Sequence, residues 1–125
     1  TMELGGHAPL IVFDDTDIER AVTFYRDTLG LPLTKRGSFG AEFLEQEPHL
    51  GVHPATHPKA KALVGRETGL TFHVPDLLHF CGILHDRGVR FVAEPTKQSF
   101  GIMAMIADPD GNIFALWDDK APEPE

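Results

Sequence analysis

The stretch DPDGNIFALWD, residues 108–118, combines a tight turn with the strand that follows it. Aspartate, proline and glycine in this order accept the backbone angles of a chain reversal. A strand that follows such a turn near the end of a small chain is a common place for a metal-binding carboxylate. At the position where such a carboxylate is expected, this strand instead carries the methyl group of Ala115. The first functional question is therefore whether the chain binds a metal ion.

The composition is that of an ordinary globular domain. The 125 residues suffice for one domain with its own core, and 42% of them are hydrophobic. The formal net charge of −8 disfavours nucleic acid as a partner, because phosphate backbones select basic surfaces, and it mildly favours cationic small molecules. No apolar run approaches the roughly 18 residues of a membrane span, and no signal pattern opens the chain. We expect a cytoplasmic protein without a membrane partner.

Outward from the turn, the predicted elements follow the same order in both halves of the chain. The first half contains a strand, a helix and three strands, at residues 8–13, 17–29, 31–36, 41–46 and 49–53. The second half contains the matching series, at residues 69–74, 77–87, 89–94, 102–107 and 112–118. This order predicts two copies of one βαβββ unit.

Short signals mark the ends of the two predicted helices. Asp15 or Thr16 is placed to cap the first helix, and Asp76 to cap the second. Gly30 and Gly88 follow their last turns, where glycine commonly ends a helix. The single cysteine, residue 81, excludes an intramolecular disulfide and lies on the apolar side of the second helix, which indicates a buried hydrophobe.

The tripeptide SFG occurs at 38–40 and again at 99–101, at the same place in each half. The linker at 54–61 is polar and broken by proline. These features predict one domain over residues 1–119, followed by a flexible tail at 120–125. Within the domain, the first module covers about residues 8–54 and the second about 69–118.

The chain resembles the vicinal oxygen chelate superfamily, which includes glyoxalase I, extradiol dioxygenases and bleomycin-resistance proteins. The resemblance rests on four segments in the family's order: DIERAVTFYRDTLGL at 17–31, HVPDL at 73–77, RGVRFVAEP at 87–95 and ADPDGNIFALWD at 107–118. It implies an α+β fold in which two βαβββ modules pair half-open mixed sheets into a cup. It also implies a homodimer.

The resemblance further implies four metal-ligand positions, on the first and last strands of each module. In this chain they fall at Leu10, His53, Gly69 and Ala115. Of these side chains only His53 can coordinate a metal, and one ligand does not make a site. We therefore predict no metal cofactor. A divalent metal would need a non-standard set of ligands, for which His7 is one source.

The same resemblance directs six candidate ligand-binding residues into the cup: His53, Thr71, His73, Met103, Met105 and Trp117. Strand alternation places neighbouring members, such as Thr71 and His73, on one face. A cavity lined by a few polar groups, methionine and indole suits a small organic ligand. Each residue also has a structural alternative, because histidine, methionine and tryptophan are all common in cores.

Three functions follow from these residues. The leading hypothesis is metal-independent binding of a small organic molecule, for which a cationic aromatic compound suits the acidic chain. The alternative is a glyoxalase-like lyase, isomerase or dioxygenase that uses His53 in a non-standard metal site, with His73 as general base. The third is a scaffold whose own side chains fill the cup. No catalytic residue is assigned.

Overall fold

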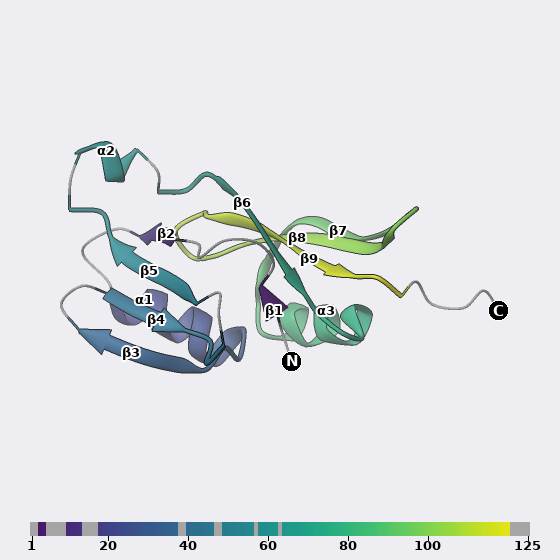
Figure 1. The fold of residues 1–125 in the computed structure, drawn as a ribbon. Helices are drawn as coiled ribbons and strands as arrows, with labels where there is room; N and C mark the ends of the chain where they lie inside the picture. Colours follow the sequence, from purple (N-terminus) through teal and green to yellow (C-terminus); the bar gives the residue numbers. More distant parts are fainter. Residues whose placement is uncertain are drawn as a thin grey trace.

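The computed structural model describes residues 3–4, 10–13, 18–37, 40–46, 49–56, 58–62 and 64–120. These residues form two mixed sheets with helices packed against them (Figure 1). The predicted α+β fold of two βαβββ modules is confirmed. Residues 121–125, most of the predicted tail, lie outside the described part, as do Asp15 and Thr16.

The first module builds a four-stranded sheet. Its order is β2 (Leu10–Phe13), β5 (Leu50–Pro54), β4 (Gly40–Phe43) and β3 (Leu33–Gly37), with β2 and β5 parallel and the other pairs antiparallel. The first helix begins as α1 (Ile18–Thr23) and continues as a wider turn, η1 (Phe24–Thr28). Gly30 follows it with a φ of 79°, as predicted for a residue that ends a helix. Strand β4 is shorter than predicted, because Leu44 takes a positive φ of 77° and ends it.

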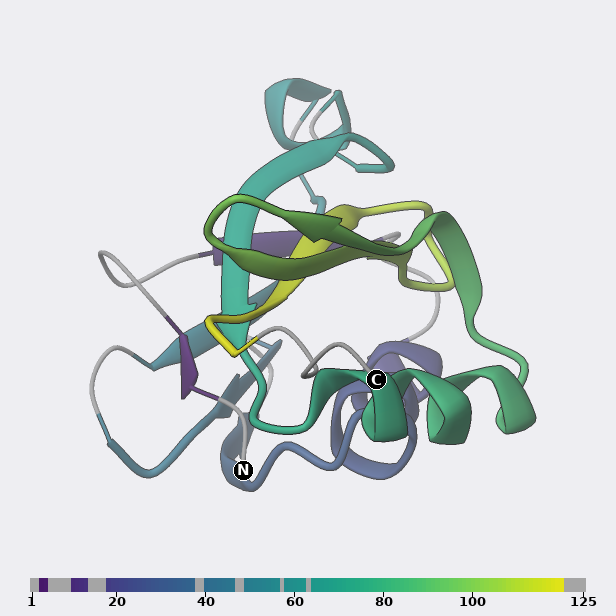
Figure 2. The ribbon, with the colours of Figure 1, turned by 90° about the vertical axis from the view of Figure 1, so that its right-hand side faces the viewer.

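The second module builds a five-stranded sheet. Its order is β1 (Glu3–Leu4), β6 (Glu67–His73), β9 (Ile113–Asp118), β8 (Gly101–Ala107) and β7 (Arg90–Gln98), with β6 and β9 parallel. Helix α3 (Leu77–Asp86) packs beside this sheet (Figure 2). The sequence did not predict β1 or the short helix α2 (Pro58–Lys61), since two and four residues are too few to show a period.

Two predicted boundaries of the second module need correction. Strand β7 runs to Gln98 rather than ending near residue 94, because register shifts on either side of Ala93 accommodate Pro95 within it. Asp76 does not cap α3: its backbone is left-handed, with a φ of 55°, and its side chain makes no capping hydrogen bond. The Leu77 N–H instead donates to Oδ2 of Asp118 on β9, at 3.3 Å.

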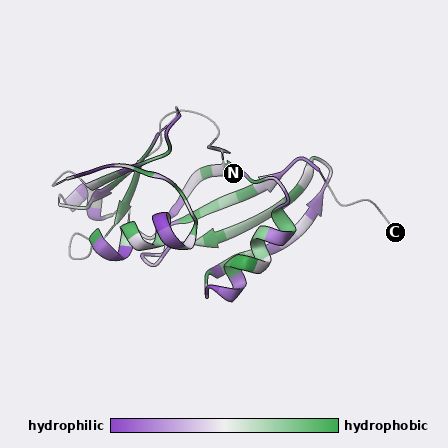
Figure 3. Cartoon of the chain, turned by 90° about the horizontal axis from the view of Figure 1, so that it is seen from below, coloured by the Kyte–Doolittle hydropathy of each residue, from purple (hydrophilic) through white to green (hydrophobic). Residues whose placement is uncertain are grey.

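One hydrophobic core extends through both modules. The ring of Tyr25 lies 5.7 Å from that of Phe43 and 6.1 Å from that of Phe114, and Phe114 in turn contacts Phe72 at 5.4 Å between centroids. All four side chains are fully buried. Figure 3 shows the corresponding apolar colour along the strands, with polar and apolar colour alternating around the helices. No helix among the described residues is long and apolar enough to cross a membrane.

Asp108, the first residue of the DPDG turn, joins the two modules through buried hydrogen bonds. Its carboxylate accepts from the Tyr25 hydroxyl at 2.6 Å, from Asn112 Nδ2 at 2.9 Å, and from the N–H groups of Asp110 and Asn112 at 2.9 Å each. Asn112 Nδ2 also donates to the main-chain oxygen of Val12 at 2.8 Å. Burial, with the nearby Asp108 carboxylate, raises the pKa of Tyr25 well above its usual value. The hydroxyl therefore stays protonated and keeps donating.

The structure explains why the last residue of each SFG tripeptide is glycine. Gly40 begins β4 with a φ of 124°, and Gly101 begins β8 with a φ of 133°. A Cβ on Gly40 would lie 2.1 Å from the main-chain oxygen of Val52, and one on Gly101 equally close to that of Asp118. Only glycine fits at both positions. The two modules therefore share this close approach of backbones.

We expect Gly101→Ala to lower the free energy of unfolding by about 2–3 kcal/mol, because both the clash and the positive φ disfavour a side chain. Urea unfolding followed by circular dichroism measures this change. Gly82→Ala in α3 is the matched control, since its Cβ would meet nothing within 4 Å. It should raise stability by about 0.5–1 kcal/mol. Equal stabilities for the two variants would contradict the expectation.

The thiol of Cys81 is buried against the sheet, as the sequence indicated. Burial raises its pKa to about 11, with a smaller contribution from the Glu94 carboxylate. A thiol with this pKa is almost wholly protonated at neutral pH. Cys81 therefore acts as a core side chain.

Candidate ligand-binding site

Five of the six candidate residues lie on one face of the five-stranded sheet, which we call the open face. The strand register arranges this face as two rows that cross the sheet: Thr71, Ala115, Met105 and Ala93 form one row, and His73, Trp117, Met103 and Thr96 form the other. Residues that pair across strands share a face. The sequence missed Ala93 and Thr96, because the register shifts in β7 hide the alternation there.

The open face is not part of the core. Its larger side chains, such as Met105 and Trp117, remain partly exposed. Residues that alternate with them, such as Phe72 and Leu116, are completely buried on the opposite face. The methionines and the indole therefore form a partly exposed apolar surface, to which a ligand can add cover.

The two aromatic rings of the open face, His73 and Trp117, each make a hydrogen bond through a ring nitrogen. His73 and Trp117 lie with ring centroids 5.1 Å apart and their planes inclined by 56°. Trp117 Nε1 donates to the main-chain oxygen of Phe100 at 3.3 Å, and His73 Nε2 donates to Oδ1 of Asp119 at 3.2 Å. The hydrogen bond from His73 lowers the pKa of Asp119. Asp119 therefore provides a negative charge at the edge of the open face.

Ala115 contributes one of the smallest side chains of the open face. It lies between Thr71 on β6 and Met105 on β8, and Ala93 continues the same row on β7. Two methyl groups therefore stand in one row and the larger Trp117 in the next. No carboxylate projects from position 115.

His53 lies apart from the other five candidates, on β5 of the four-stranded sheet. There it pairs with Val12 of β2 and shares the less buried side of that sheet with Gly51. His49, four residues earlier in the chain, donates through Nδ1 to the main-chain oxygen of Leu44 at 2.7 Å. Within one chain, the described structure does not bring His53 into the rows of the open face.

The four family positions do not fit a metal centre. The register places Val12 beside His53, whereas Leu10 pairs with Gly51. It likewise places Thr71 beside Ala115. Gly69, the position assigned by counting along the sequence, lies within the irregularity of β6 between Glu67 and Thr71. His7 lies outside the described residues.

Another group of possible metal ligands lies where β6 and β9 end. One ligand atom each from His73, Asp118 and Asp119 falls within 4.8 Å of the other two, and no other such group occurs in the described ranges. Both oxygens of Asp118 already accept main-chain hydrogen bonds, from Leu77 at 3.3 Å and from Lys120 at 3.1 Å. Sequence reasoning missed this group, because alternation along β9 directs Asp118 and Trp117 to opposite faces.

The fold and the open face define a small two-module protein whose candidate site lies on a sheet. A model of the Glyoxalase/Bleomycin resistance protein/Dioxygenase superfamily matches residues 9–116, and the chain belongs to this superfamily. The search of proteins with curated functions gave no match.

Several solved structures share the fold. One is TnmS3, an antibiotic binding protein from Streptomyces sp. CB03234, with 28% identity and a TM-score of 0.71 over 91% of this chain and 96% of that one. A second is a superfamily member from Sphaerobacter thermophilus, with 21% identity and a TM-score of 0.75 over 91% and 98%. A third is a glyoxalase/bleomycin resistance protein from Streptomyces sp. CB03234, with 26% identity and a TM-score of 0.62 over 86% and 96%.

Proposed function

We propose that this protein binds a small organic molecule on the open face without a metal ion. The observation that carries the proposal is the row of small side chains at Ala115 and Ala93, beside the partly exposed Met105 and Trp117. A flat ligand seated there would bury apolar surface of both partners and stack on the indole. The antibiotic-binding role of TnmS3, at 28% identity, supports this choice.

The polar groups of the open face suit a ligand that is aromatic and cationic. The Thr71 hydroxyl and the His73 imidazole offer hydrogen bonds that would orient the ligand. Asp119 adds a carboxylate beside His73, and the whole chain carries a formal charge of −8. A cation gains from both, and it also interacts favourably with the face of an indole.

The binding proposal is tested by placing a larger side chain at position 115. Ala115→Leu should weaken the binding of planar aromatic cations such as proflavine by at least about tenfold, because the added side chain occupies the ligand's volume. Quenching of the fluorescence of Trp117, the single tryptophan, measures binding directly. Ala62→Leu, at an exposed position next to α2, is the matched control and should bind as the unmodified protein does. Unchanged affinity in Ala115→Leu would refute a site on this face.

We also propose a homodimer in which a second chain pairs along a sheet edge and leaves the open face accessible to the ligand. The support is that, among the described residues, β3 and β7 each pair with another strand on one side only. Light scattering at micromolar concentration should give twice the chain mass of 13.8 kDa. A species of the single-chain mass alone would sink the dimer.

The enzyme alternative has one observation in its favour, the group of His73, Asp118 and Asp119. Elemental analysis of protein purified without added metal separates it from the binding proposal. We expect no stoichiometric nickel, zinc, manganese or iron. About one metal ion per chain that disappears in His73→Ala would replace metal-independent binding with a metal-using function.

A further inference from the structure

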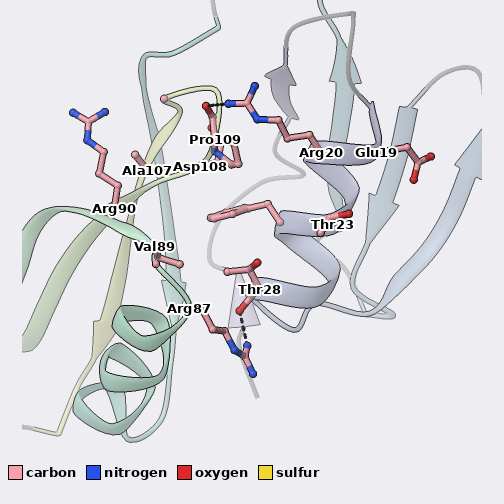
Figure 4. Close-up of a pocket in the computed structure, with 13 residues that line it drawn as sticks. Glu19, Arg20, Thr23, Thr28, Arg87, Val89, Arg90, Ala107, Asp108 and Pro109 are labelled. Carbon is pink, nitrogen blue, oxygen red and sulfur yellow. Dashed lines mark hydrogen bonds between the residues drawn. The ribbon is translucent and has the colours of Figure 1, made fainter.

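A hollow lies away from the open face, between the helix of the first module and the start of β7 in the second. Its volume is about 610 Å³, within the usual range for ligand pockets. Figure 4 shows Arg20 and Thr23 on the helical wall and Val89 and Ala107 opposite them. We call this hollow the helix groove.

Two arginines bridge the helix groove at its ends (Figure 4). Arg20 of α1 donates to the main-chain oxygen of Pro109 in the DPDG turn. Arg87, just after α3, donates through Nη1 to the main-chain oxygens of Thr28 at 2.7 Å and Asp27 at 3.3 Å. Each arginine comes from one module and reaches the other. Contacts between the two modules therefore lie at both ends of the groove.

The helix groove concentrates positive charge in an acidic chain. Three of the six arginines line it, namely Arg20, Arg87 and Arg90. The acceptors of Arg87 are main-chain oxygens, so no carboxylate neutralises its charge. Among the described residues, no acceptor binds Nε or Nη2 of Arg87. The same holds for the guanidinium group of Arg90.

Each carboxylate around the groove already has a partner. Glu19, on the rim, forms an ion pair with Arg36. Asp108 accepts its four hydrogen bonds inside the core, at the far side from Arg87. Asp110 lies 3.9 Å from Arg20. The wall that carries Arg87 and Arg90 is therefore the positive side of the groove.

We propose that the helix groove binds a small organic anion, an aromatic or short acyl body that carries a carboxylate or a similar oxyanion. The apolar body would lie on Val89, Ala107 and Phe24. The anionic group would accept from the remaining N–H donors of Arg87 and from Arg90, whose long side chain turns outward in Figure 4 and can fold over the groove. This preference for anions is opposite to that of the open face.

The test is a titration of ¹⁵N-labelled protein with 2-naphthoate and, separately, with the cation 2-naphthylmethylammonium. We expect the naphthoate to shift the amide signals of Gly88 and Val89 saturably, and to leave the indole N–H signal of Trp117 unmoved. The cation should not shift the groove amides. Raising the salt from about 20 to about 200 mM should weaken naphthoate binding severalfold, because the guanidinium groups are exposed.

Arg90→Gln tests the charge without removing a contact that holds the modules together, and it should weaken naphthoate binding about fivefold. Arg66→Gln is the matched control, an exposed arginine outside the groove, and should leave the affinity unchanged. The proposal is overturned if Arg90→Gln binds naphthoate as tightly as the unmodified protein, or if naphthoate shifts only the Trp117 indole signal. Neither result bears on cation binding at the open face, which the second ligand reports.

Discussion

Trp117→Ala should weaken the binding of planar aromatic cations by at least about tenfold while the protein remains folded. The indole shares the open face with Ala115, and ring stacking together with the apolar area lost is worth at least about tenfold in affinity. Its side chain is partly exposed, so truncation should lower the free energy of unfolding by only about 1–2 kcal/mol, against about 3–5 kcal/mol for a core tryptophan.

Isothermal titration calorimetry measures the affinity, since this variant has lost the fluorescent reporter. Trp117→Phe is the control that keeps an aromatic face and loses the hydrogen bond to Phe100. It should recover part of the binding. Severe unfolding of Trp117→Ala, together with no ligand for the unmodified protein in a broad screen, would leave the scaffold hypothesis standing.

Asp108→Ala should lower the free energy of unfolding by at least about 4 kcal/mol, a large part of the stability of a domain this size. The substitution leaves four buried donors without their acceptor: the Tyr25 hydroxyl, Asn112 Nδ2 and the N–H groups of Asp110 and Asn112. Urea unfolding measures the loss. Asp86→Ala, at an exposed position on α3, is the control and should change stability by less than about 0.5 kcal/mol.

The hydrogen bond between Tyr25 and Asp108 also makes the stability of the protein depend on pH. The pKa of Tyr25 in the folded protein lies well above the unfolded value of about 10, so its contribution to stability is complete below that pH and decreases as the pH rises above it. Tyr25→Phe should reduce this alkaline loss above about pH 10, because Tyr25 is the only tyrosine, whereas the Cys81 thiol, whose pKa is also raised, contributes in both proteins. Unfolding curves between about pH 8 and pH 11 that run parallel for the two proteins would contradict the buried hydrogen bond as its source.

The order of the elements could be predicted because its causes are local. The helix that ends at Gly30 and the turn at Asp108 depend on neighbouring residues within a few positions, as periodicity and turn chemistry require. The repeated Gly40 and Gly101 also signalled the duplication, although the close approach of backbones that demands them was visible only in the structure. Strand alternation likewise predicted correctly that Met103 and Met105 share a face with each other.

The register between strands could not be predicted from the chain. The irregularity in β6 places Thr71 beside Ala115, and the register shifts in β7 add Ala93 to the same row. Asp118 replaces Asp76 as the cap of α3, a contact between residues 41 positions apart. Such pairings depend on how two separate segments meet, which local sequence does not encode.

The sequence by itself determined the two-module architecture, the buried state of Cys81 and the lack of a ligand atom on the side chain of Ala115. Only the tertiary structure decided which side chains share the open face, that His53 lies on the other sheet, and that Arg20 and Arg87 border one groove. The reason is that the chemical type of a side chain excludes some roles, such as metal coordination by alanine, wherever that side chain lies in the fold. A site forms only when the packing of distant segments brings several side chains together.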